Sequence, residues 1–449
     1  MFSKILIANR GEIAVRIIRA CREMGISTVA IYSEADKNAL HVSLADEAYC
    51  VGPAQVGESY LNMLSILTIA FYSGAQAIHP GYGLLSENAK FVTLCEKCNI
   101  TFIGPSSDMI SSLGDKDKAR KTMQEAGVPV TPGTEVITDE NEARAAAKKI
   151  GYPILIKARS GGGGRGIRLV EKDGDFLNAF RSASSEAAAA FGDSGCYIEK
   201  FLHPVKHIEM QILCDKHGNV LCLGERECSV QRKNQKLIEE SPSPSITPEI
   251  RENMMEAATK AAKAVNYNSV GTIEFLLDKD KNFYFMEMNT RLQVEHGVTE
   301  MVTGIDLVQW QIRVAAGAKL NKTQDQIFFH GHVIECRINA ENPDKNFMPS
   351  CGKITQLHIP GGSFVRFDTA IYQNYVIPPF YDSMVGKVIV QGRNRELAIR
   401  KMKMALSELS IGGIEHNRNL QVEILSEKEF VDGTYTTDFI ADFEKRRNG

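Results

Sequence analysis

The sequence of 449 residues lacks any apolar run of the roughly 18 residues that a membrane-spanning helix needs. It also lacks an excess of charge of one sign, because its net charge at pH 7 is only -3. Such a surface gives no long-range attraction toward nucleic acid. The opening segment, Met1–Ala14, predicts a strand at once and leaves no room for a signal or transit peptide. We therefore expect a cytoplasmic protein that binds neither a membrane nor nucleic acid.

Cysteine pairs with the spacing of a disulfide framework or a zinc site are also missing. The ten cysteines are scattered, and Cys21, Cys50, Cys214 and Cys222 lie within apolar runs, which is typical of reduced and buried thiols. The CxxC motif at 95–98 has no second pair or histidine cluster after it and lies in a stretch that predicts a helix. The sequence therefore predicts neither a disulfide scaffold nor structural zinc.

What the sequence does contain is enough apolar side chains for several cores, at 43% of its residues, and its length predicts about three domains. Residues 1–114 alternate strand-like runs such as KILIA with helical stretches, which predicts a parallel α/β layer. The first turn, NRGEIA, has one glycine in place of G-x-G-x-x-G, so dinucleotide binding is disfavoured. Residues 328–445 predict a mixed, β-rich closing domain with a helix near Asn394–Leu409. The fold class is thus α/β and α+β.

The stretch from Phe285 to His296 alternates polar and apolar residues strictly. In an extended chain one face would carry a single polar row, made of Glu287, Asn289, Arg291, Gln293 and Glu295. The alternative is an amphipathic strand with a solvated polar face. Solvated faces favour Lys, Ser and Thr, whereas this row holds metal-ligand and anion-binding groups. We therefore predict a binding site along this row.

A hairpin before this row supplies a further carboxylate. Gly271–Leu277 and Asn282–Met288 predict two strands, and Asp278–Lys281 predicts the turn between them. We expect a register that sets Glu274 opposite Phe285, with Glu287 one diagonal away. Magnesium prefers such oxygen ligands beside substrate phosphates, although acid–base pairs in hydrolases look similar. Glu274, Glu287 and Asn289 are the predicted magnesium ligands.

The segment Gly151–Val170 reads as a strand with Lys157 near its end, a glycine run and a second strand. Glycines allow backbone N–H groups to wrap phosphate oxygens. A flexible hairpin turn is the alternative. No Gly-Lys-Ser/Thr follows, so this is not a Walker loop. We predict a hinged lid over a triphosphate.

This lid with its strand lysine, followed by the paired glutamates, resembles the ATP-grasp superfamily. More specific segments, from Ile5 to about Phe443, resemble biotin carboxylase: ANRGEIA (Ala8–Ala14), HPGYGLLSEN (His79–Asn88), MNTRLQVEH (Met288–His296) and YDSMVGK (Tyr381–Lys387). The resemblance implies an N-terminal α/β domain at 1–114, an ATP-grasp domain at 115–322 with an inserted lid at about 130–201, and a C-terminal domain at 328–445.

The resemblance also implies a reaction. ATP, with two Mg²⁺ or Mn²⁺ ions, would phosphorylate bicarbonate to carboxyphosphate, and the released carbon dioxide would carboxylate biotin on a separate carrier protein. This is the first half-reaction of acetyl-CoA carboxylase, on the route to malonyl-CoA and fatty acids. The implied partners are the biotin carboxyl carrier protein, the carboxyltransferase subunits and a second copy of the chain in a homodimer.

The family motifs assign roles to residues of this sequence. Lys116, Lys157 and the amides of Gly163 and Gly164 would bind phosphates. The nucleotide base would lie against the hinge, which consists of Glu199, Lys200, Phe201 and Leu202. It would also lie beside His207. Bicarbonate would be held by Lys236, Arg291, Gln293 and the Val294 amide. Glu295 would take the bicarbonate proton, Arg337 would stabilise the biotin enolate, and Tyr82 would contact the biotin ring.

Two positions qualify this resemblance. The family usually has histidine where this chain has Asn234, which keeps a donor and an acceptor but cannot become charged, so the nucleotide contact there is in doubt. Met402–Met404 matches the core of a biotinyl-lysine motif, but its flanks have helical spacing, so we expect no biotin on Lys403.

Two other classes remain as alternatives, an ATP-grasp carboxylate–amine ligase and a nucleotide-binding regulator without catalysis. The presence of Lys236, Arg291, Glu295 and Arg337 together disfavours both. The sequence does not specify the final acceptor of the carboxyl group, because that specificity lies on another subunit.

Overall fold

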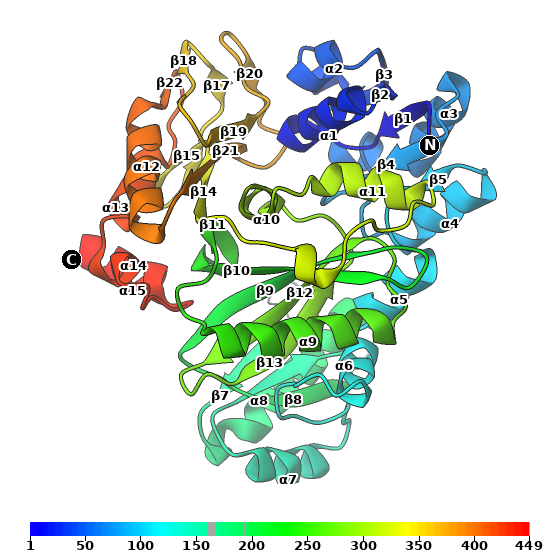
Figure 1. The fold of residues 1–449 in the computed structure, drawn as a ribbon. Coiled ribbons are helices and arrows are strands. Elements are labelled where there is room, and N and C mark those ends of the chain that lie inside the picture. Colours follow the sequence, from blue (N-terminus) through cyan, green and yellow to red (C-terminus); the bar gives the residue numbers. More distant parts are fainter. Residues whose placement is uncertain (160–166, 193, 449) are drawn as a thin grey trace.

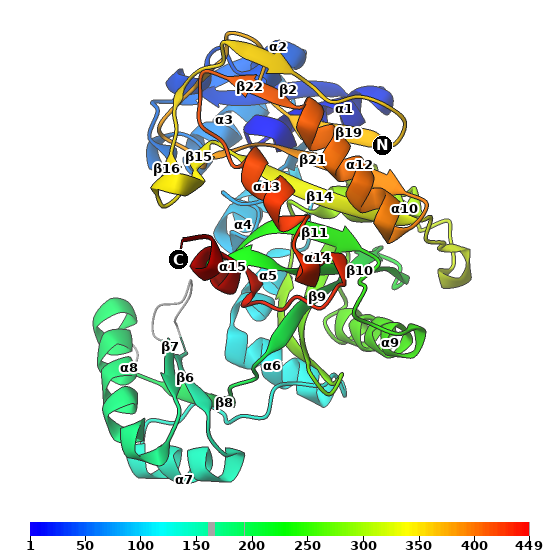
Figure 2. The same ribbon diagram turned by 90° about the vertical axis from the view of Figure 1, so that its left-hand side faces the viewer.

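The computed structural model describes residues 1–159, 167–192 and 194–448. Figure 1 shows three packed regions, with the N-terminal region in blue, a central sheet in green and the C-terminal region in orange and red. A smaller lid, which contains the elements between residues 140 and 200, lies below the central sheet and is separated from it in Figure 2. No helix among the described residues is long and apolar enough to cross a bilayer.

The N-terminal region is built on a five-stranded parallel sheet of order β3-β2-β1-β4-β5. The predicted parallel α/β layer is therefore confirmed, although the short edge strand β3 was not predicted. Apolar residues recur along the first helix at Ile13, Ile17 and Cys21, and this face packs into a buried core. The strands are β1 Lys4–Ile7, β2 Ser27–Ser33, β3 Glu47–Gly52, β4 Ala77–His79 and β5 Thr101–Phe102. The helices are α1 Gly11–Glu23, α2 Leu40–Leu44, α3 Met63–Ser73, α4 Ala89–Lys97 and α5 Ser107–Gly114, and the next helix, α6 Lys116–Glu125, packs in the core of the central sheet.

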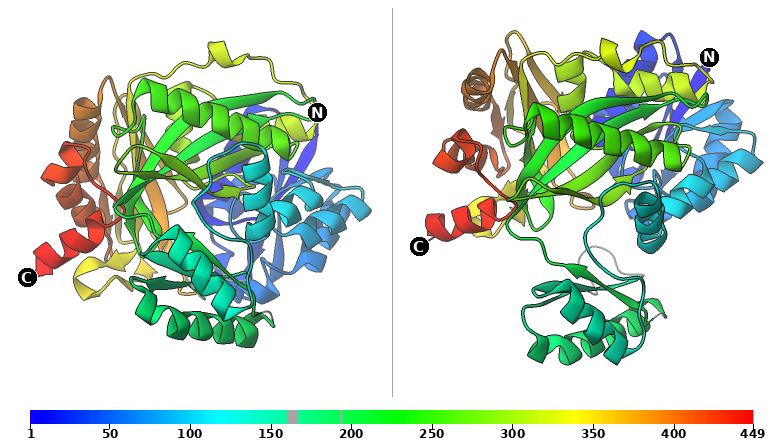
Figure 3. Two further views of the ribbon diagram at one scale, coloured as in Figure 1. Left: turned by 90° about the horizontal axis from the view of Figure 1, so that it is seen from below. Right: turned by 60° about the horizontal axis from the view of Figure 1, so that its bottom comes forward.

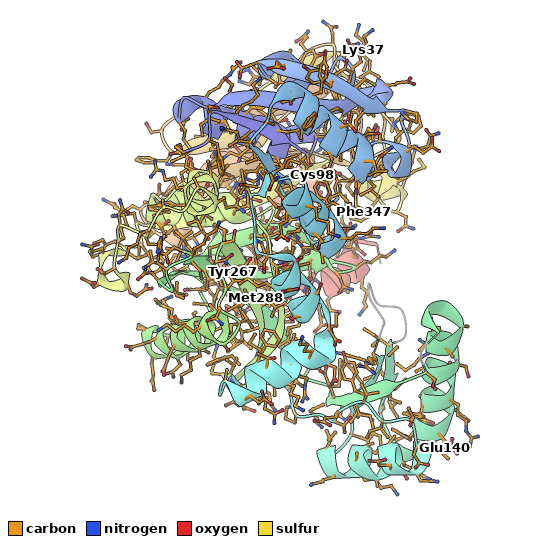
Figure 4. The ribbon with its side chains drawn as sticks, turned by 90° about the vertical axis from the view of Figure 1, so that its right-hand side faces the viewer. Lys37, Cys98, Glu140, Tyr267, Met288 and Phe347 are labelled. Atoms are coloured by element: carbon orange, nitrogen blue, oxygen red, sulfur yellow. The ribbon has the colours of Figure 1, made fainter. Side chains whose placement is uncertain are left out.

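The central sheet has eight antiparallel strands in the order β13-β12-β9-β10-β11-β14-β21-β19. Strands from the later part of the chain thus extend the sheet that the middle part begins. One face packs against α9, and Figure 4 labels two residues of this core, Tyr267 and Met288. The strands are β9 Val205–Cys214, β10 Val220–Arg232, β11 Gln235–Ser241, β12 Val270–Asp278, β13 Phe283–Asn289, β14 His332–Asn339, β19 Val365–Thr369 and β21 Met384–Gly392. The helices beside the sheet are α9 Pro248–Ala264, α10 His296–Thr303 and α11 Leu307–Ala315.

The lid is a three-stranded antiparallel sheet of order β7-β6-β8 with two helices on one face. Two chain segments join it to the rest of the molecule, as the right-hand view of Figure 3 shows. The two strands predicted on either side of the glycine run are confirmed, while the run itself, with Gly163 and Gly164, lies outside the described residues. The elements are β6 Ile154–Ala158, β7 Ile167–Val170, β8 Cys196–Lys200, α7 Glu140–Ile150 and α8 Phe176–Phe191.

The C-terminal region adds short strand pairs and four helices to the end of the central sheet. The predicted helix near Asn394–Leu409 is α12, and the three short helices after it were not predicted. The strands are β15 Glu341–Asn342, β16 Met348–Pro349, β17 Gly352–Lys353, β18 Gln356–His358, β20 Val376–Ile377 and β22 Ser410–Gly412. The helices are α12 Arg395–Glu408, α13 Arg418–Ile424, α14 Lys428–Val431 and α15 Phe439–Asn448. Short 3-10 helices lie in the connections: η1 Glu34–Asp36, η2 Val56–Glu58, η3 Asp173–Asp175, η4 Gln324–Gln326 and η5 Pro343–Lys345.

The prediction of one extended polar row was wrong in two respects. Strand β13 ends at Asn289, and the chain then turns before α10 begins at His296. The register is also shifted, because Glu274 pairs directly with Glu287 while Phe275 pairs with Phe285. A bulge at Met286 produces this shift and lets both Phe285 and Met288 pack in the central core. Alternation in the sequence does not show where an extra residue is inserted.

The cysteine prediction is largely confirmed. Cys21, Cys214 and Cys222 are buried free thiols, and burial raises the pKa of Cys21 to about 12. Cys50 is the exception, since it is exposed on the edge strand β3. An apolar run at the edge of a sheet is buried less fully than the same run in its middle.

Candidate active site

One cavity of about 870 Å³ lies between the lid, the central sheet and the C-terminal region. Its lining comes from all parts of the chain and includes every predicted site residue that the structure describes. These are Tyr82, Lys116, Lys157, Glu199, Lys200, Phe201, Leu202, His207, Asn234, Lys236, Glu274, Glu287, Asn289, Arg291, Gln293, Val294, Glu295 and Arg337. The tertiary structure therefore brings these residues to one place, including those outside the predicted row.

The ammonium group of Lys236 lies at the centre of a carboxylate cluster on the cavity floor. Its Nζ is 2.9 Å from Glu209, 3.2 Å from Glu274 and 2.7 Å from Glu295. Burial alone would lower the pKa of Lys236, but these carboxylates raise it well above its usual range. Lys236 therefore carries a positive charge that can be shared with a small anion.

Glu295 is held between two cations. One carboxylate oxygen accepts from Lys236 at 2.7 Å, and the other accepts from Arg337 at 2.8 Å. Burial would raise the pKa of Glu295, but Lys236, Arg337 and the buried Arg226 lower it well below its usual range. Arg337 also donates to Glu239, from Nε at 2.6 Å, so one guanidinium is divided between two carboxylates.

The predicted magnesium ligands share one end of the hairpin. Glu274 accepts from Asn289 at 2.9 Å and from Gln293 at 2.8 Å, and its other oxygen is 3.0 Å from Nε2 of His207. Glu287 is its direct cross-strand partner, so the two carboxylates share a face. Two carboxylates and a carboxamide oxygen are ligands that fit a hard divalent cation. The donor set therefore fits magnesium.

The lysines predicted to bind phosphates reach the cavity from different elements. Lys116 begins α6, and its Nζ is 3.6 Å from Glu287. Lys157 extends from the lid strand β6 and donates to Glu199 on β8. In the structure each ammonium group thus contacts a carboxylate at the edge of the cavity, Lys157 within the lid and Lys116 beside the central sheet.

The hinge is an extended segment that leaves β8. The side chain of Lys200 donates to the carbonyls of Gly151 and Tyr152, at 2.8 and 3.0 Å. The ring of Phe201 stacks on that of His203 with a centroid distance of 5.5 Å. Leu202 lines the cavity next to them. The hinge therefore presents an apolar surface fixed at its lid end.

Asn234 occupies a tight turn between β10 and β11. Lys233 and Asn234 both have positive φ, 48° and 63°, which a two-residue turn of type I′ requires. Asparagine tolerates this left-handed backbone better than most residues. Asparagine at position 234, where the family usually has histidine, is therefore compatible with the turn.

Three residues that anchor Arg291 and Tyr82 had no predicted role in the site: Glu87, Glu12 and Asn9. Arg291 donates to Glu87 at 2.8 Å and to the side-chain oxygen of Asn289 at 3.0 Å. Tyr82 donates its hydroxyl to Glu12, and Asn9 donates to the Tyr82 carbonyl at 2.8 Å. Both side chains are thus held by the N-terminal region.

Three further charged residues beneath the cavity floor were missed: Glu209, Arg226 and Glu239. Arg226 is completely buried and donates to Gln211 and Gln293, both at 2.6 Å. It therefore fixes the amide side chain that contacts Glu274. Only Glu209 could have been found from a local pattern, because His207, Glu209 and Gln211 alternate with apolar residues along β9.

Family models match most of the chain. The biotin carboxylase N-terminal domain matches residues 1–110, the ATP-binding domain of the carbamoyl-phosphate synthase L chain matches 115–323, and the biotin carboxylase C-terminal domain matches 335–442. Biotin carboxylase 1 of Bacillus subtilis is 55% identical over 446 residues, which cover 99% of each chain. The 2-oxoglutarate carboxylase small subunit of Hydrogenobacter thermophilus is 49% identical over 441 residues, which cover 98% of this chain and 93% of the relative.

Solved structures agree with these matches. Biotin carboxylase of Campylobacter jejuni, in complex with a β,γ-ATP compound, is 49% identical with a TM-score of 0.94, and the match covers 98% of this chain and 99% of the other. The biotin carboxylase domain dimer of 2-oxoglutarate carboxylase from Hydrogenobacter thermophilus contains MgADP, ADP and bicarbonate. It is 49% identical with a TM-score of 0.92, and the match covers 99% of this chain and 98% of the other.

The three-part fold, the lid and the carboxylate-lined cavity define the class as an ATP-grasp enzyme. Among such enzymes, the chain belongs to the biotin carboxylase family.

Proposed function

We propose that the chain is the biotin carboxylase component of a multi-subunit carboxylase. It uses ATP to activate bicarbonate and places the carboxyl group on biotin, which a separate carrier protein presents. The observation that carries this proposal is the cluster on the floor of the cavity in which Glu295 accepts hydrogen bonds from both Lys236 and Arg337. A carboxylate–amine ligase has no need of a base held between two cations.

Bicarbonate binds between Lys236 and Arg291 in this proposal, with Gln293 and the Val294 amide completing the pocket. Arg291 offers a planar fork that matches a planar anion, and it is already oriented by Glu87. Gln293 is oriented by Arg226 and Glu274 on its two amide atoms. The pocket is thus formed before the anion arrives.

Glu295 is the base that accepts the bicarbonate proton. Its low pKa in the structure comes from the positive charges of Lys236 and Arg337, which also donate hydrogen bonds to it. An anion that draws the Lys236 ammonium toward itself weakens one of these bonds and makes Glu295 more basic. Substrate binding therefore prepares the base.

Arg337 stabilises the enolate-like oxygen of deprotonated biotin. A guanidinium stays charged at all relevant pH values and cannot serve as an acid, so electrostatic stabilisation is the role open to it. Its position between Glu239 and Glu295 fixes its plane. Tyr82 lines the same side of the cavity and contacts the biotin ring.

The nucleotide occupies the part of the cavity between the lid and the hinge. Its base contacts the segment from Glu199 to Leu202 and lies near His207 and Asn234, while Lys116, Lys157 and the amides of Gly163 and Gly164 bind the phosphates. Glu274, Glu287 and Asn289 hold magnesium. When bound, the metal neutralises charge on the phosphate oxygens, as phosphoryl transfer requires.

Biotin comes from a separate carrier protein, because Lys403 lies within helix α12 and not in an exposed turn. We place the enzyme in the cytoplasm, in an acetyl-CoA carboxylase with carboxyltransferase subunits, as a homodimer. A second candidate is a component of a pyruvate or 2-oxoglutarate carboxylase, which is favoured by relatives that carry those names at 52% and 49% identity.

Phosphate release from ATP tests the proposal. We expect release to need Mg²⁺ and bicarbonate and to rise when free biotin is added. A rate that ignores bicarbonate and responds to an amine would identify a carboxylate–amine ligase. Tight ATP binding without turnover would identify a regulator.

A further inference from the structure

Four of the motifs that resemble biotin carboxylase meet at one buried ammonium group, that of Lys387. Glu12 comes from ANRGEIA on α1, Tyr82 from HPGYGLLSEN after β4, and Val294 from MNTRLQVEH before α10. Lys387 comes from YDSMVGK on β21. These motifs lie in three different regions of the chain, and only Val294 and Tyr82 have a proposed contact with substrate.

The contacts form a continuous chain. Lys387 donates its Nζ to the carbonyl oxygen of Val294, and the same Nζ is 3.4 Å from the carboxylate of Glu12. Glu12 in turn accepts the hydroxyl of Tyr82. The Lys387 side chain is 0% exposed and that of Glu12 is 3% exposed, so water does not screen their attraction.

Glu12 is the carboxylate that lies against Lys387; burial raises its pKa, and the Lys387 ammonium opposes that shift. Two other carboxylates lie near the ammonium, but Asp368 is bound by both Nε and Nη2 of Arg366, at 2.8 and 2.6 Å. Glu335 has no hydrogen-bond partner among the described residues, and burial raises its pKa well above the usual range. Burial would lower the pKa of Lys387, but Glu12, Glu335 and Asp368 raise it, so the amine stays charged.

The Lys387 contact fixes the orientation of one peptide group in the anion pocket. The carbonyl of Val294 and the N–H of Glu295 belong to one planar trans peptide, so they point in opposite directions. The preceding carbonyl, of Gln293, is held separately by the ring of His296 at 2.8 Å. The Lys387 contact therefore fixes the peptide that leads into the Glu295 side chain, while the His296 contact fixes the preceding peptide, which carries the Val294 N–H.

A buried ion pair is weak evidence of a stabilising role. Replacing such a pair with apolar residues of similar size is often neutral or stabilising, because the desolvation of two charges is costly. An apolar side chain at 387 would fill the space but would leave the Val294 carbonyl without its donor. What the ammonium supplies specifically is the direction of that carbonyl.

We propose that Lys387 is a positioning residue for bicarbonate, which acts through the Val294 carbonyl, and that Glu12 extends this control to Tyr82 on the biotin side. The inference rests on the proposed function, since Lys387 and Glu12 act on residues that the proposed function assigns to substrate binding. Glu12 thus joins the two substrate sites, because it contacts both the ammonium behind the anion pocket and the hydroxyl of Tyr82.

The test compares Michaelis constants for three variants, measured as bicarbonate-dependent phosphate release. In Lys387→Met we expect the KM for bicarbonate to rise about 10- to 100-fold, the scale of a small misplacement of binding groups. The KM for ATP should stay within about threefold of the parent, because no nucleotide contact is assigned to this peptide. Lys401→Met is the matched control, since Lys401 also donates to two backbone carbonyls, of Ser363 and Gln391, but far from the turn. It should leave both constants unchanged.

Glu12→Gln provides a second route if Lys387→Met fails to fold. The carboxamide still accepts the Tyr82 hydroxyl but no longer balances the ammonium, so we expect the bicarbonate KM to rise about 3- to 10-fold. The KM for free biotin should rise with it.

Two results would overturn the inference. One is a bicarbonate KM like the parent's in folded Lys387→Met, or in Glu12→Gln where Lys387→Met does not fold. The other is an equal rise of the ATP and bicarbonate constants, which indicates a general structural loss. Failure of the proposed function looks different, because the parent itself would then show no bicarbonate-dependent turnover.

Discussion

Glu239 and Glu240 are neighbours on β11, yet they face opposite sides of the central sheet and have opposite surroundings. Glu240 faces the C-terminal helices and accepts from Arg395 twice, at 2.7 and 2.9 Å, from Tyr435, and from His332 at 2.5 Å in its donating tautomer. Glu239 lies on the other side, buried beneath the cavity floor, and shares Arg337 with Glu295. Its second oxygen has no hydrogen-bond partner among the described residues.

The two carboxyls show this difference in their pKa values. Burial works against ionisation of both, but His332 and Arg395 lower the pKa of Glu240 to about 2. Burial raises the pKa of Glu239 to about 7, although Arg337 opposes it. One face of the strand uses every hydrogen bond to hold the structure together. On the other face, one oxygen of Glu239 stays buried without a hydrogen-bond partner among the described residues.

The largest effect is expected for the base on the cavity face. Glu295→Gln should lose both biotin carboxylation and bicarbonate-dependent ATP cleavage, by about 100- to 10,000-fold, because proton removal comes before carboxyphosphate forms. Nucleotide affinity should stay near that of the parent. Phosphate release and carboxybiotin formation measure the two activities, and a parent-like rate of ATP cleavage would show that Glu295 is not the base.

Arg337→Ala should separate the two steps. Carboxylation should fall about 100- to 1000-fold, the usual cost of deleting an oxyanion donor. ATP cleavage with bicarbonate should fall much less, because on the bicarbonate side Arg337 contacts only the base, Glu295. Parallel assays of both activities check this, and an equal loss of both would assign Arg337 to bicarbonate as well.

On the opposite face, Glu240→Gln should lower the free energy of unfolding at pH 7 by about 3 kcal/mol, the cost of breaking a buried ion pair. Activity per folded molecule should not change. The folded-state pKa of about 2 lies below the usual 4.5, so the parent gains stability as pH rises through this window and loses it as pH falls. Urea unfolding between pH 3 and 7 should show a flatter acid limb in the variant.

Glu239→Gln should act in the opposite sense. A folded-state pKa of about 7 against the usual 4.5 means that the folded protein binds more protons between these values, so stability falls as pH rises across them. Glu239→Gln removes this titrating group, so the decrease in the free energy of unfolding with rising pH should be smaller by on the order of 1 kcal/mol. Urea unfolding at pH 5 and pH 8 measures this decrease in the parent and in the variant. If both proteins show the same difference between pH 5 and pH 8, Glu239 does not titrate as the contrast with Glu240 requires.

The smallest effect is expected away from both faces. Lys403 lies on α12, so the purified chain should carry no biotin even after co-expression with a biotin ligase. Streptavidin blotting of the parent and of Lys403→Ala should give no signal for either. A strong signal in the parent that is lost in the variant would make the chain its own carrier.

The sequence predicted the site residues better than their geometry. The carboxylate, carboxamide and guanidinium groups in the Phe285–His296 stretch indicated metal and anion binding by their chemistry. That prediction did not require the correct strand register, and the residues do line one cavity. The bulge at Met286 and the turn after Asn289 were not predictable, because packing of Phe285 and Met288 in one core decides them. Glu239 and Arg226 were missed for a related reason, since nothing local distinguishes a charge buried beneath a site from one on a surface.

The order of strands in the central sheet also has a consequence for biosynthesis. Val294 is translated 93 residues before Lys387, the residue that holds its carbonyl. At about 5–20 residues per second, roughly 5 to 20 s separate the two on the ribosome. Throughout that interval the Val294 carbonyl lacks the Lys387 ammonium that holds it, so the proposed anion pocket cannot take its final geometry. This peptide is therefore held in place only after β21 has been synthesised and has joined the sheet.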